Sequence, residues 1–401
     1  MEATLAKSEK FFGAVLVTGA RQVGKTTLLK KLKPDLGYFS LDDPVLLRSA
    51  LEEPGTFCKM MQPPAIIDEV QYAPGLFPHL KMLLDTLNKK GLFFLSGSQQ
   101  FQMMKNVGES LAGRLGILNL PGLSLRELGG IACDLPFLPE REYFAARKKE
   151  PAAPNYRGIW EIIQRGDMPA LYENAEMDWQ MFYAAYTRTY IERDVRDLAQ
   201  VGDEGKFLKF MTSVAARTGQ LLNLASISRD AGVSQSTIDR WLSILRASNL
   251  IYLLEPYHNN VTKRAIKTPK LYFLNTGLAA YLTRWNTPEV LRNGAMAGAF
   301  FETFVVAEIL KSYANAGIMD PPLYFYRDKE RNEIDLVIRR GMTLYPLEIK
   351  KHADPRPDDA AVFAALDKIP GVTRAPGGVL CLYETLAPLQ GEDVVIPLRY
   401  V

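Results

Sequence analysis

The sequence predicts a multidomain α/β protein, in which compact units of different character follow one another. Its 401 residues, 47% hydrophobic and 23% charged, correspond to two to four domains that can each bury a core. Near the amino terminus, short apolar runs alternate with polar turns and helical patterns, as parallel strands with crossover helices do. The net charge of +3 is unevenly spread, since residues 205–284 contain 11 Lys and Arg against 3 Asp and Glu. One middle segment is therefore strongly basic.

Cysteine usage and hydropathy indicate a cytoplasmic protein that does not associate with membranes. Cys58, Cys133 and Cys381 are far apart and lack the close spacing of a zinc site, and their odd number argues against a disulfide framework. The apolar run at 11–20 leads into a polar motif rather than a cleavage site, so it reads as a buried strand. No apolar stretch approaches the roughly 20 residues of a membrane helix.

The stretch GARQVGKTT, residues 19–27, has the spacing of a phosphate-binding loop. It follows a predicted strand, AVLVTG, and precedes a helical pattern, LLKKL, which is the context that this motif requires. Glycines let the backbone N–H groups approach phosphate, the lysine reaches phosphate oxygens and the threonine hydroxyl can bind Mg²⁺. The predicted nucleotide-binding residues are Gly19, Gly24, Lys25, Thr26 and Thr27.

Two further apolar runs end in polar side chains that belong beside bound phosphate. AIID (65–68) is expected to be a neighbouring parallel strand that delivers Asp68 to Mg²⁺, and Glu69 would then position or activate the attacking water. LFFLSGS (92–98) ends in Ser96 and Ser98, either of which could contact the γ-phosphate or be a plain turn serine. The string NKKG lacks the aspartate that recognises guanine, so ATP is the expected nucleotide.

These motifs, together with SLAGRLGILNLPGLSLREL, resemble the AAA-type ATPase module of a large group of uncharacterised bacterial and archaeal proteins. The resemblance implies ATP hydrolysis. It also implies that Arg114 contacts the γ-phosphate, in its own chain or in a neighbouring subunit of a homo-oligomer. An ordinary structural ion pair is the alternative role of Arg114.

The basic middle segment reads as a helix-turn-helix. A helix over roughly 224–230 is followed by a Gly232 turn and by a second helix capped by Ser234. Apolar residues form one face of the second helix, and a basic loop before the next strand resembles the wing of a winged helix, with Lys270 at its end. A winged helix can also contact proteins or cover an ATPase core, but the charge favours DNA. The expected DNA-binding residues are Gln235, Ser236, Thr237, Arg240, Lys263, Arg264 and Lys267.

A second site is expected in the C-terminal part. The helix over 297–313 is apolar nearly all round, so Glu302 should point inward and need a partner. If Gly341 occupies the first central position of a type II′ turn, Asp335 and Glu348 lie opposite each other on one face of a hairpin, and Lys350 shares that face. Two facing carboxylates need a cation, which is either Mg²⁺ or Mn²⁺ or, in a plain polar hairpin, Lys350 itself.

The order Glu302, Asp335, Glu348 and Lys350 resembles the PD-(D/E)XK nuclease pattern, with Ile334 where that pattern has proline. The resemblance implies a restriction-endonuclease-like α/β domain. The expected organisation is an ATPase core (1–133), a helical connector or lid (134–204), a winged helix (205–284) and a nuclease-like domain (285–401), with 136–156 as a linker or mobile insertion. The expected function is ATP-driven action on DNA, with a possible metal-dependent nuclease. The alternative is an ATP-driven switch whose last two domains contact proteins without cleavage, and Glu69 disfavours a kinase because it fits water activation.

Overall fold

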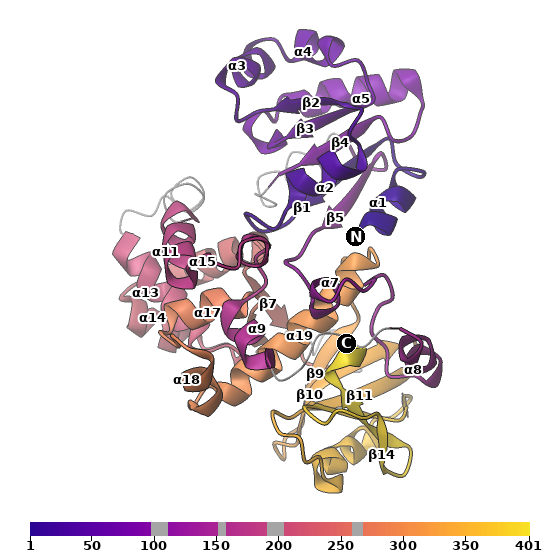
Figure 1. Ribbon diagram of the computed structural model, residues 1–401, viewed down its shortest axis with the longest axis vertical. Helices are drawn as coiled ribbons and strands as arrows, with labels where there is room; N and C mark the ends of the chain where they lie inside the picture. The colour runs from indigo at the N-terminus through magenta and orange to yellow at the C-terminus, as the bar shows by residue number, and fades with distance from the viewer. Residues whose placement is uncertain (98–110, 151–157, 191–203, 259–267) are drawn as a thin grey trace.

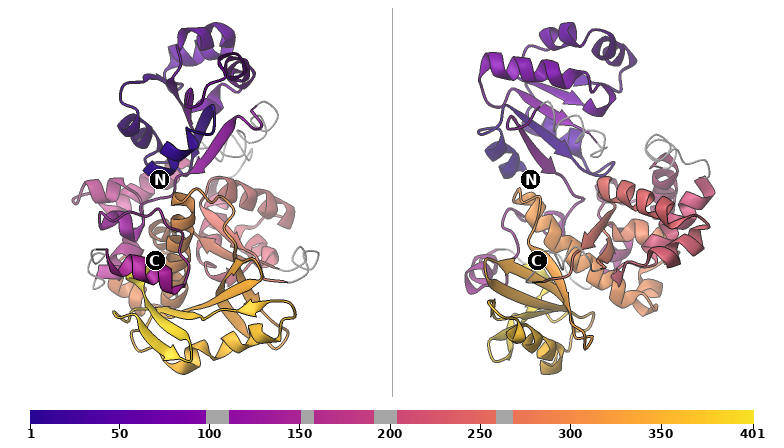
Figure 2. Two further views of the ribbon diagram at one scale, coloured as in Figure 1. Left: turned by 90° about the vertical axis from the view of Figure 1, so that its right-hand side faces the viewer. Right: turned by 180° about the vertical axis from the view of Figure 1, so that it is seen from behind.

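A computed structural model describes residues 1–97, 111–150, 158–190, 204–258 and 268–401. The predictions for Ser98, Lys263, Arg264 and Lys267 therefore lie outside the described residues. Figure 1 shows three parts: a parallel sheet with its helices at the top, a mostly helical part at the left, and a mixed sheet below. The two large sheets remain apart in both further views of Figure 2.

The amino-terminal sheet is parallel throughout, with the strand order β2-β3-β4-β1-β5. Its strands are β1 (Ala14–Thr18), β2 (Gly37–Ser40), β3 (Ala65–Asp68), β4 (Phe93–Ser96) and β5 (Leu115–Asn119). β1, β3 and β4 are buried along their whole length, as apolar strands covered on both faces must be. The prediction that β3 adjoins β1 is wrong, because β4 lies between them.

Helices cover both faces of this sheet. They are α1 (Glu2–Ser8), α2 (Lys25–Leu32), α3 (Pro44–Glu52), α4 (Pro54–Met60) and α5 (Leu76–Leu87), with a short 3₁₀ turn η1 (Val70–Tyr72). Alternate residues of β1 belong to different cores: Val15 packs in the core that contains Leu29 of α2, and Leu16 in the core that contains Leu80 of α5. Because all strands are parallel, their carboxyl ends lie on the same side of the sheet, where α2 begins.

The connector is helical, and the predicted linker at 136–156 contains part of it. After α7 (Leu125–Leu128), which follows β5, the connector helices are α8 (Arg141–Lys148), α9 (Ile159–Arg165), α10 (Ala170–Glu173) and α11 (Trp179–Tyr190). Tyr143 and Phe144 of α8 are buried, and the Tyr143 hydroxyl donates a 2.7 Å hydrogen bond to the Tyr400 carbonyl. The linker prediction is wrong for 141–148, because two aromatic side chains dock this charged helix onto the end of the chain.

The middle part has the element order α13 (Glu204–Ala215), β6 (Gln220–Leu221), α14 (Leu224–Ala231), α15 (Gln235–Ala247), β7 (Ile251–Leu254) and β8 (Lys270–Phe273). Its strands form an antiparallel sheet in the order β6-β8-β7. The predicted helix pair is confirmed, since Gly232 ends α14 in the left-handed conformation and the Ser234 hydroxyl accepts the Thr237 N–H at 3.2 Å. Two helices, α17 (Thr276–Leu282) and α18 (Pro288–Asn293), lead to the last part.

The last part packs α19 (Ala297–Asn315) against a seven-stranded mixed sheet. The strand order is β14-β15-β13-β11-β10-β9, and β12 pairs with β11. Strand bounds are β9 (Leu323–Arg327), β10 (Glu333–Arg340), β11 (Thr343–Ile349), β12 (Thr373–Arg374), β13 (Gly378–Cys381), β14 (Ala387–Gln390) and β15 (Asp393–Pro397), with 3₁₀ segments η4 (Pro357–Lys368) and η5 (Leu398–Tyr400). Among the described residues, no helix is long and apolar enough to cross a membrane.

Candidate functional site

The phosphate loop joins the carboxyl end of β1 to the first turn of α2. Gly19 (φ 144°) and Gly24 (φ 94°) have backbone angles that other residues rarely adopt, and a Cβ on Gly19 would collide with the carbonyl oxygen of Leu120. The Lys25 ammonium donates to the carbonyls of Gly19 (3.1 Å) and Ala20 (2.7 Å). The lysine therefore lies across the loop that the sequence assigned to phosphate, and Thr27 lies exposed in the same helical turn.

Asp68 is the centre of a hydrogen-bond cluster beside this loop. The Thr26 hydroxyl lies 2.9 and 3.1 Å from the two Asp68 carboxylate oxygens, the Tyr38 hydroxyl donates to one of them at 2.6 Å, and the Ser96 hydroxyl also donates to Asp68. Burial, with the nearby Asp68 carboxylate, raises the pKa of Tyr38 to about 12. The sequence pointed to Asp68, Thr26 and Ser96, whereas nothing in the pattern GYFS indicated Tyr38.

The same oxygens form a donor set that suits Mg²⁺. The Thr26 hydroxyl and the Asp68 carboxylate are hard oxygen ligands. Mg²⁺ is usually held by one or two such groups together with water and substrate phosphates. Thr26 and Asp68 are within hydrogen-bond distance of each other. The residues present therefore fit Mg²⁺, and Thr26 and Asp68 are the two that would hold it.

Glu69 follows Asp68 in a left-handed conformation, with φ 55° and ψ 43°. This conformation is uncommon for a residue with a side chain and directs the chain into the η1 turn. The Gln71 side-chain amide donates a hydrogen bond to the Glu69 carboxylate. Burial raises the pKa of Glu69, and the Gln71 hydrogen bond and the Lys25 charge act in the opposite direction. Gln71 was not predicted as a site residue.

Arg114 lies at the amino-terminal ends of the strands, whereas the phosphate loop of its own chain lies at their carboxyl ends. It directly precedes β5, and its carbonyl accepts the N–H of Ala14, the first residue of β1. Its guanidinium makes two hydrogen bonds to Asp85, one of them 3.1 Å long. Because β1 and β5 run parallel, the whole length of the strand separates Arg114 from Gly19. Contact with the γ-phosphate in its own chain is excluded, and a structural ion pair is formed.

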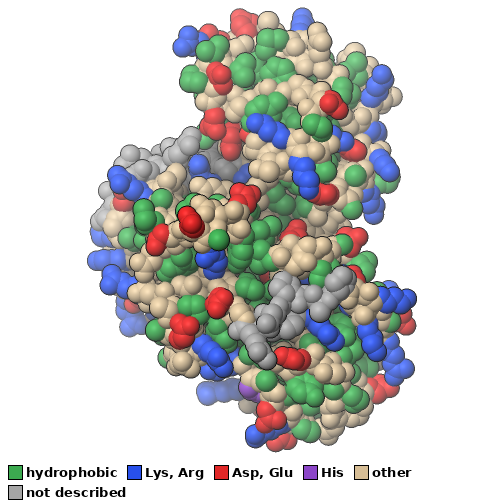
Figure 3. Space-filling model, in the orientation of Figure 1, with side chains coloured by type: hydrophobic (Ala, Val, Ile, Leu, Met, Phe, Trp, Pro, Cys, Tyr) green, Lys and Arg blue, Asp and Glu red, His purple; other side chains and the backbone are tan. Residues whose placement is uncertain are grey.

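The predicted recognition surface on α15 is exposed. Gln235, Ser236 and Arg240 are exposed and Thr237 is half-buried, while the opposite face of α15 is buried, as predicted. Figure 3 shows Lys and Arg side chains along the edge of the molecule where α13 and α14 lie. The exposed cations of α13 to α15 are Lys206, Lys209, Arg229, Arg240 and Arg246.

The C-terminal hairpin has the register that the sequence predicts. β10 pairs with β11 so that Leu336 faces Leu347 and Arg340 faces Thr343, and Gly341 has φ 62° as a type II′ turn requires. The Asp335 N–H donates to the Glu348 carboxylate at 3.3 Å, so the two residues are neighbours across the strands. The Lys350 ammonium lies 2.5 Å from Glu348 and 4.0 Å from Asp335. The prediction that these three side chains share one face is confirmed.

A second lysine reaches this cluster from the middle part. Lys270 begins β8 and is buried, with its ammonium 3.1 Å from Glu302, 2.7 Å from Glu333 and 3.6 Å from Asp335. The Tyr272 hydroxyl also donates to Glu302 at 2.7 Å. The prediction that Lys270 lies on the basic loop is therefore wrong, because Lys270 is the first residue of β8 and its charge compensates three carboxylates.

The predicted metal ligands Glu302, Asp335 and Glu348 thus form an ion-pair cluster with two lysines. Within the described part of the chain, no group of three or more His, Cys, Asp or Glu side chains is arranged to hold a metal ion, so the C-terminal metal site stays a prediction. Burial, and then the neighbouring Asp335 charge, raise the pKa of Glu302 to about 7 and that of Glu348 to about 8. Lys270 and Lys350 oppose these changes without cancelling them.

A second buried ion-pair cluster, which the sequence did not indicate, joins α19 to the segment that follows β5. The Lys311 ammonium lies 2.8 Å from Glu308 and 3.0 Å from Asp167, and it donates to the Leu123 carbonyl at 2.9 Å. The Glu308 carboxylate accepts the N–H of Leu125 at 2.6 Å. Both side chains of α19 are almost fully buried, so this segment is fixed to α19 by charge-assisted hydrogen bonds.

Residues 12–129 match the family model described as an AAA domain. Residues 156–289 and 297–401 match two other families, the domains of unknown function DUF8612 and DUF4143. Two uncharacterized proteins, Mb2031c of Mycobacterium bovis and Rv2008c of Mycobacterium tuberculosis, are each 29% identical over 345 residues, which is 85% of this chain and 71% of theirs.

Solved structures resemble the chain at low identity. The Walker-type ATPase PABY2304 of Pyrococcus abyssi is 15% identical with a TM-score of 0.42, covering 70% of this chain and 94% of that one. A single-residue variant of RuvB from Thermotoga maritima is 14% identical with a TM-score of 0.30, covering 63% and 87%. The chain thus has a parallel-sheet, P-loop ATPase-like core that is similar over residues 12–129 to AAA domains, and a separate mixed-sheet domain at the carboxyl end.

Proposed function

We propose that the chain binds ATP with Mg²⁺ at the phosphate loop, hydrolyses it, and acts on DNA through its middle part. The cluster around Asp68 carries the first half of this proposal. It places the Thr26 hydroxyl against a carboxylate at the mouth of the loop, with Glu69 directly after it. When bound, Mg²⁺ would neutralise charge on the phosphates. The phosphate loop would hold the phosphates with backbone N–H groups and Lys25, and Glu69 would orient a water molecule.

ATP binding and hydrolysis by the purified protein test this half. We expect Lys25→Ala to abolish ATP binding, because the loop loses the side chain that reaches the phosphates. Glu69→Gln should bind ATP and fail to turn it over. Tight ATP binding by the Lys25 variant would contradict the assignment of the loop.

DNA contact is supported by the exposed polar and basic residues at the start of α15. Gln235, Ser236 and Arg240 project from the amino-terminal turns of the second helix of a helix-turn-helix, where such helices meet base edges. Thr237 is half-buried, and its hydroxyl lies 2.9 Å from that of Ser234. It is therefore less available than its neighbours for contact with DNA. The loop cations Lys263, Arg264 and Lys267 remain part of the proposal on their sequence alone.

The salt dependence of DNA binding tests this contact. Each phosphate contact contributes about −0.9 to the slope of log affinity against log salt. Changing Lys263, Arg264 and Lys267 together to Ala should flatten the slope by up to about three contacts. Arg240→Ala should weaken binding and reduce discrimination between sequences. An unchanged slope would favour a protein-contact role for the middle part.

The C-terminal ion pairs favour the alternative function for the last part, a switch that contacts a protein partner, or a second copy of this chain, without cutting DNA. The Lys270 ammonium, which is not part of the nuclease pattern, lies 3.1 Å from Glu302 and 3.6 Å from Asp335, two of the carboxylates that a metal-dependent nuclease would use. Plasmid nicking in Mg²⁺ or Mn²⁺ distinguishes the two functions, and we expect none. Nicking by the wild type that Asp335→Ala and Lys350→Ala both abolish would instead assign a nuclease.

A further inference from the structure

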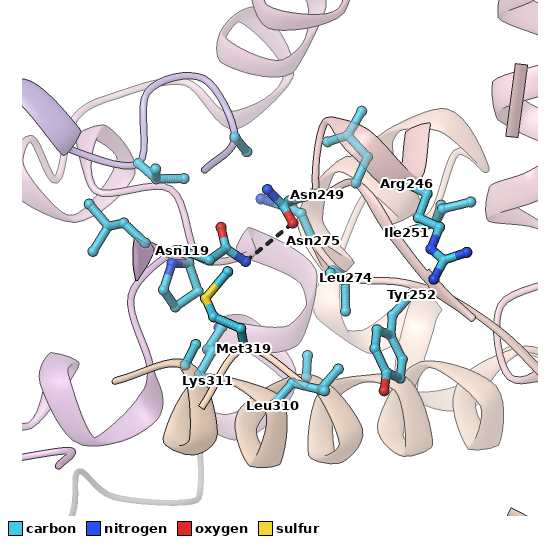
Figure 4. A pocket seen from close by; sticks show the side chains of 18 of the residues that line it. Asn119, Arg246, Asn249, Ile251, Tyr252, Leu274, Asn275, Leu310, Lys311 and Met319 are labelled. Atoms are coloured by element: carbon cyan, nitrogen blue, oxygen red, sulfur yellow. Dashed lines mark hydrogen bonds between the residues drawn. The ribbon is translucent and has the colours of Figure 1, made fainter. Parts of the chain in front are cut away.

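A cavity of about 600 Å³ lies where the three parts of the chain meet (Figure 4). Ala20 and Val23 of the phosphate loop line it, together with Asn119 at the end of β5. Asn249, in the turn after α15, and Tyr252 of β7 line it from the middle part. Its volume falls within the roughly 300–1,000 Å³ typical of small-molecule sites. A ligand held by the phosphate loop would therefore border a cavity large enough for the remainder of a nucleotide.

Two asparagines meet at this cavity and leave hydrogen-bonding capacity unused. The Asn119 amide donates to the Asn249 side-chain oxygen at 3.2 Å, across 130 residues of sequence (Figure 4). The Asn119 Oδ1 and the Asn249 Nδ2 are buried and have no hydrogen-bond partner among the described residues. Burying an unpaired polar atom costs about 1–3 kcal/mol, so two such atoms on neighbouring side chains destabilise the protein unless a ligand or water pairs them.

The number of unpaired donors and acceptors is the same in either orientation of the two side-chain amides. If both side chains are rotated by a half turn, Asn249 donates to Asn119, and again one oxygen and one amide nitrogen remain unpaired. The pair thus offers one acceptor and one donor on adjacent side chains. Asparagine amides also rotate broadly about χ2, so both atoms can turn toward a ligand in the cavity.

An acceptor next to a donor complements the amino edge of adenine. Adenine donates from its N6 amino group and accepts at the neighbouring ring nitrogen, which is the arrangement that asparagine and glutamine amides pair with. Guanine has an acceptor, O6, where adenine has the amino donor, and its N7 edge offers two acceptors. The asparagine pair therefore complements the N6/N7 edge of adenine and does not complement the N7 edge of guanine.

We propose that this cavity holds the base of the nucleotide bound at the phosphate loop, and that Asn119 and Asn249 recognise its amino edge. This inference rests on the proposed ATP binding. It adds the residues that select the base, and it assigns one of them to the ATPase core and the other to the middle part. Base binding would thus depend on both parts being in place.

Titrations in Mg²⁺ with ATP, GTP and inorganic triphosphate test the proposal. Asn119→Ala and Asn249→Gly each remove one amide, and glycine suits the φ of 55° at position 249. Asn88→Gly is the matched control, since Asn88 ends α5 with φ 45° and does not line the cavity. We expect each of the first two variants to weaken ATP roughly ten-fold, with triphosphate changing less than about two-fold. The control should bind as the wild type does.

The outcomes separate this inference from the proposed function. If both variants bind ATP as tightly as the wild type while Lys25→Ala does not bind it, the base assignment is wrong and the phosphate loop stands. Equal weakening of ATP and triphosphate would also overturn it, because the asparagines would then affect the loop rather than the base. A wild type that binds no ATP would overturn both. Retained triphosphate binding shows that the variants are folded.

Discussion

Glu69 and Gln71 form a two-residue unit whose chemistry can be tested by pH. The Gln71 hydrogen bond stabilises the charged form of Glu69, against the burial that raises the pKa of this carboxyl. Removing the amide in Gln71→Ala should therefore raise the Glu69 pKa further. Because the ionised carboxylate is the form that accepts a proton, the acidic limb of the rate against pH should move to higher pH, and kcat on that limb should fall about ten-fold for each pH unit of the move.

ATPase rates measured at intervals from about pH 5.5 to about pH 9 test this shift. Gln71→Glu is an informative companion, because a second carboxylate would repel Glu69 and move the limb in the same direction. A kcat that falls equally at every pH would show that Gln71 only shapes the η1 turn.

The Asp68 cluster shows which residues of the site could be predicted from the sequence and which could not. Thr26 and Asp68 are fixed by a motif and by the end of a buried strand, so their proximity could be predicted. Tyr38 could not, because it lies within β2, whose place beside β3 is a long-range fact of strand order. Gln71 could not either, because its contact depends on the left-handed conformation of Glu69.

The hairpin of β10 and β11 gives the C-terminal part a predicted response to pH. With a raised pKa of about 8, Glu348 keeps its proton in the folded chain while the unfolded chain loses it above about pH 4.5. Raising the pH from about 5 to about 8 therefore lowers the free energy of unfolding through this group. Glu348→Gln has no such proton, so we expect it to gain at least about 1 kcal/mol relative to wild type over this range.

Melting temperatures of both proteins, taken at intervals of about one pH unit across this range, measure the difference. The exposed Glu384→Gln serves as control and should show no pH-dependent difference from wild type. A constant difference for Glu348→Gln would mean that Glu348 titrates alike in the folded and unfolded chains.

Strand β8 carries a stability prediction, because it places Lys270 among three carboxylates. Lys270→Met leaves these carboxylates without their buried cation, and breaking such a pair costs about 3–5 kcal/mol. Urea unfolding should show this loss, and adding Glu302→Gln should recover part of it. Lys351→Met, at an exposed lysine of the last part, should lie within about 0.5 kcal/mol of wild type. A loss below about 1 kcal/mol for Lys270→Met would contradict the role of Lys270.

The same elements mark the limit of prediction from sequence. Register in the hairpin follows from turn chemistry, so the sequence alone places Asp335 opposite Glu348. Pro346 is tolerated because β11 pairs with β12 at 343–344 and with β13 at 347–349, which leaves the proline between the two partners. The contacts of Lys270 with the carboxylates could not be predicted, because a charge count assigns a lysine to a segment of the sequence and says nothing of its tertiary contacts.

At the scale of the whole molecule, Arg114 can contact the γ-phosphate only in a neighbouring copy of the chain. If it does, specific ATPase activity should rise with protein concentration, and Arg114→Ala should be inactive although it binds ATP. Mixing Arg114→Ala with Lys25→Ala should then restore activity, since the second variant supplies the arginine to the intact site of the first. Absence of complementation, with activity independent of concentration, would leave Arg114 as the partner of Asp85 alone.

Helix α19 touches all three parts of the molecule and works as a rigid rod between two charged clusters. Near one end, Lys311 and Glu308 hold the segment that follows β5, and nine residues away Glu302 holds Lys270. At about 1.5 Å per residue the two points are about 14 Å apart. A tilt of about 10° at the core end would therefore displace Glu302 by roughly 2 Å over this length. That displacement is large beside the 3.1 Å contact with Lys270, so a small rotation in the nucleotide-binding part is enough to open an ion pair in the distant sheet.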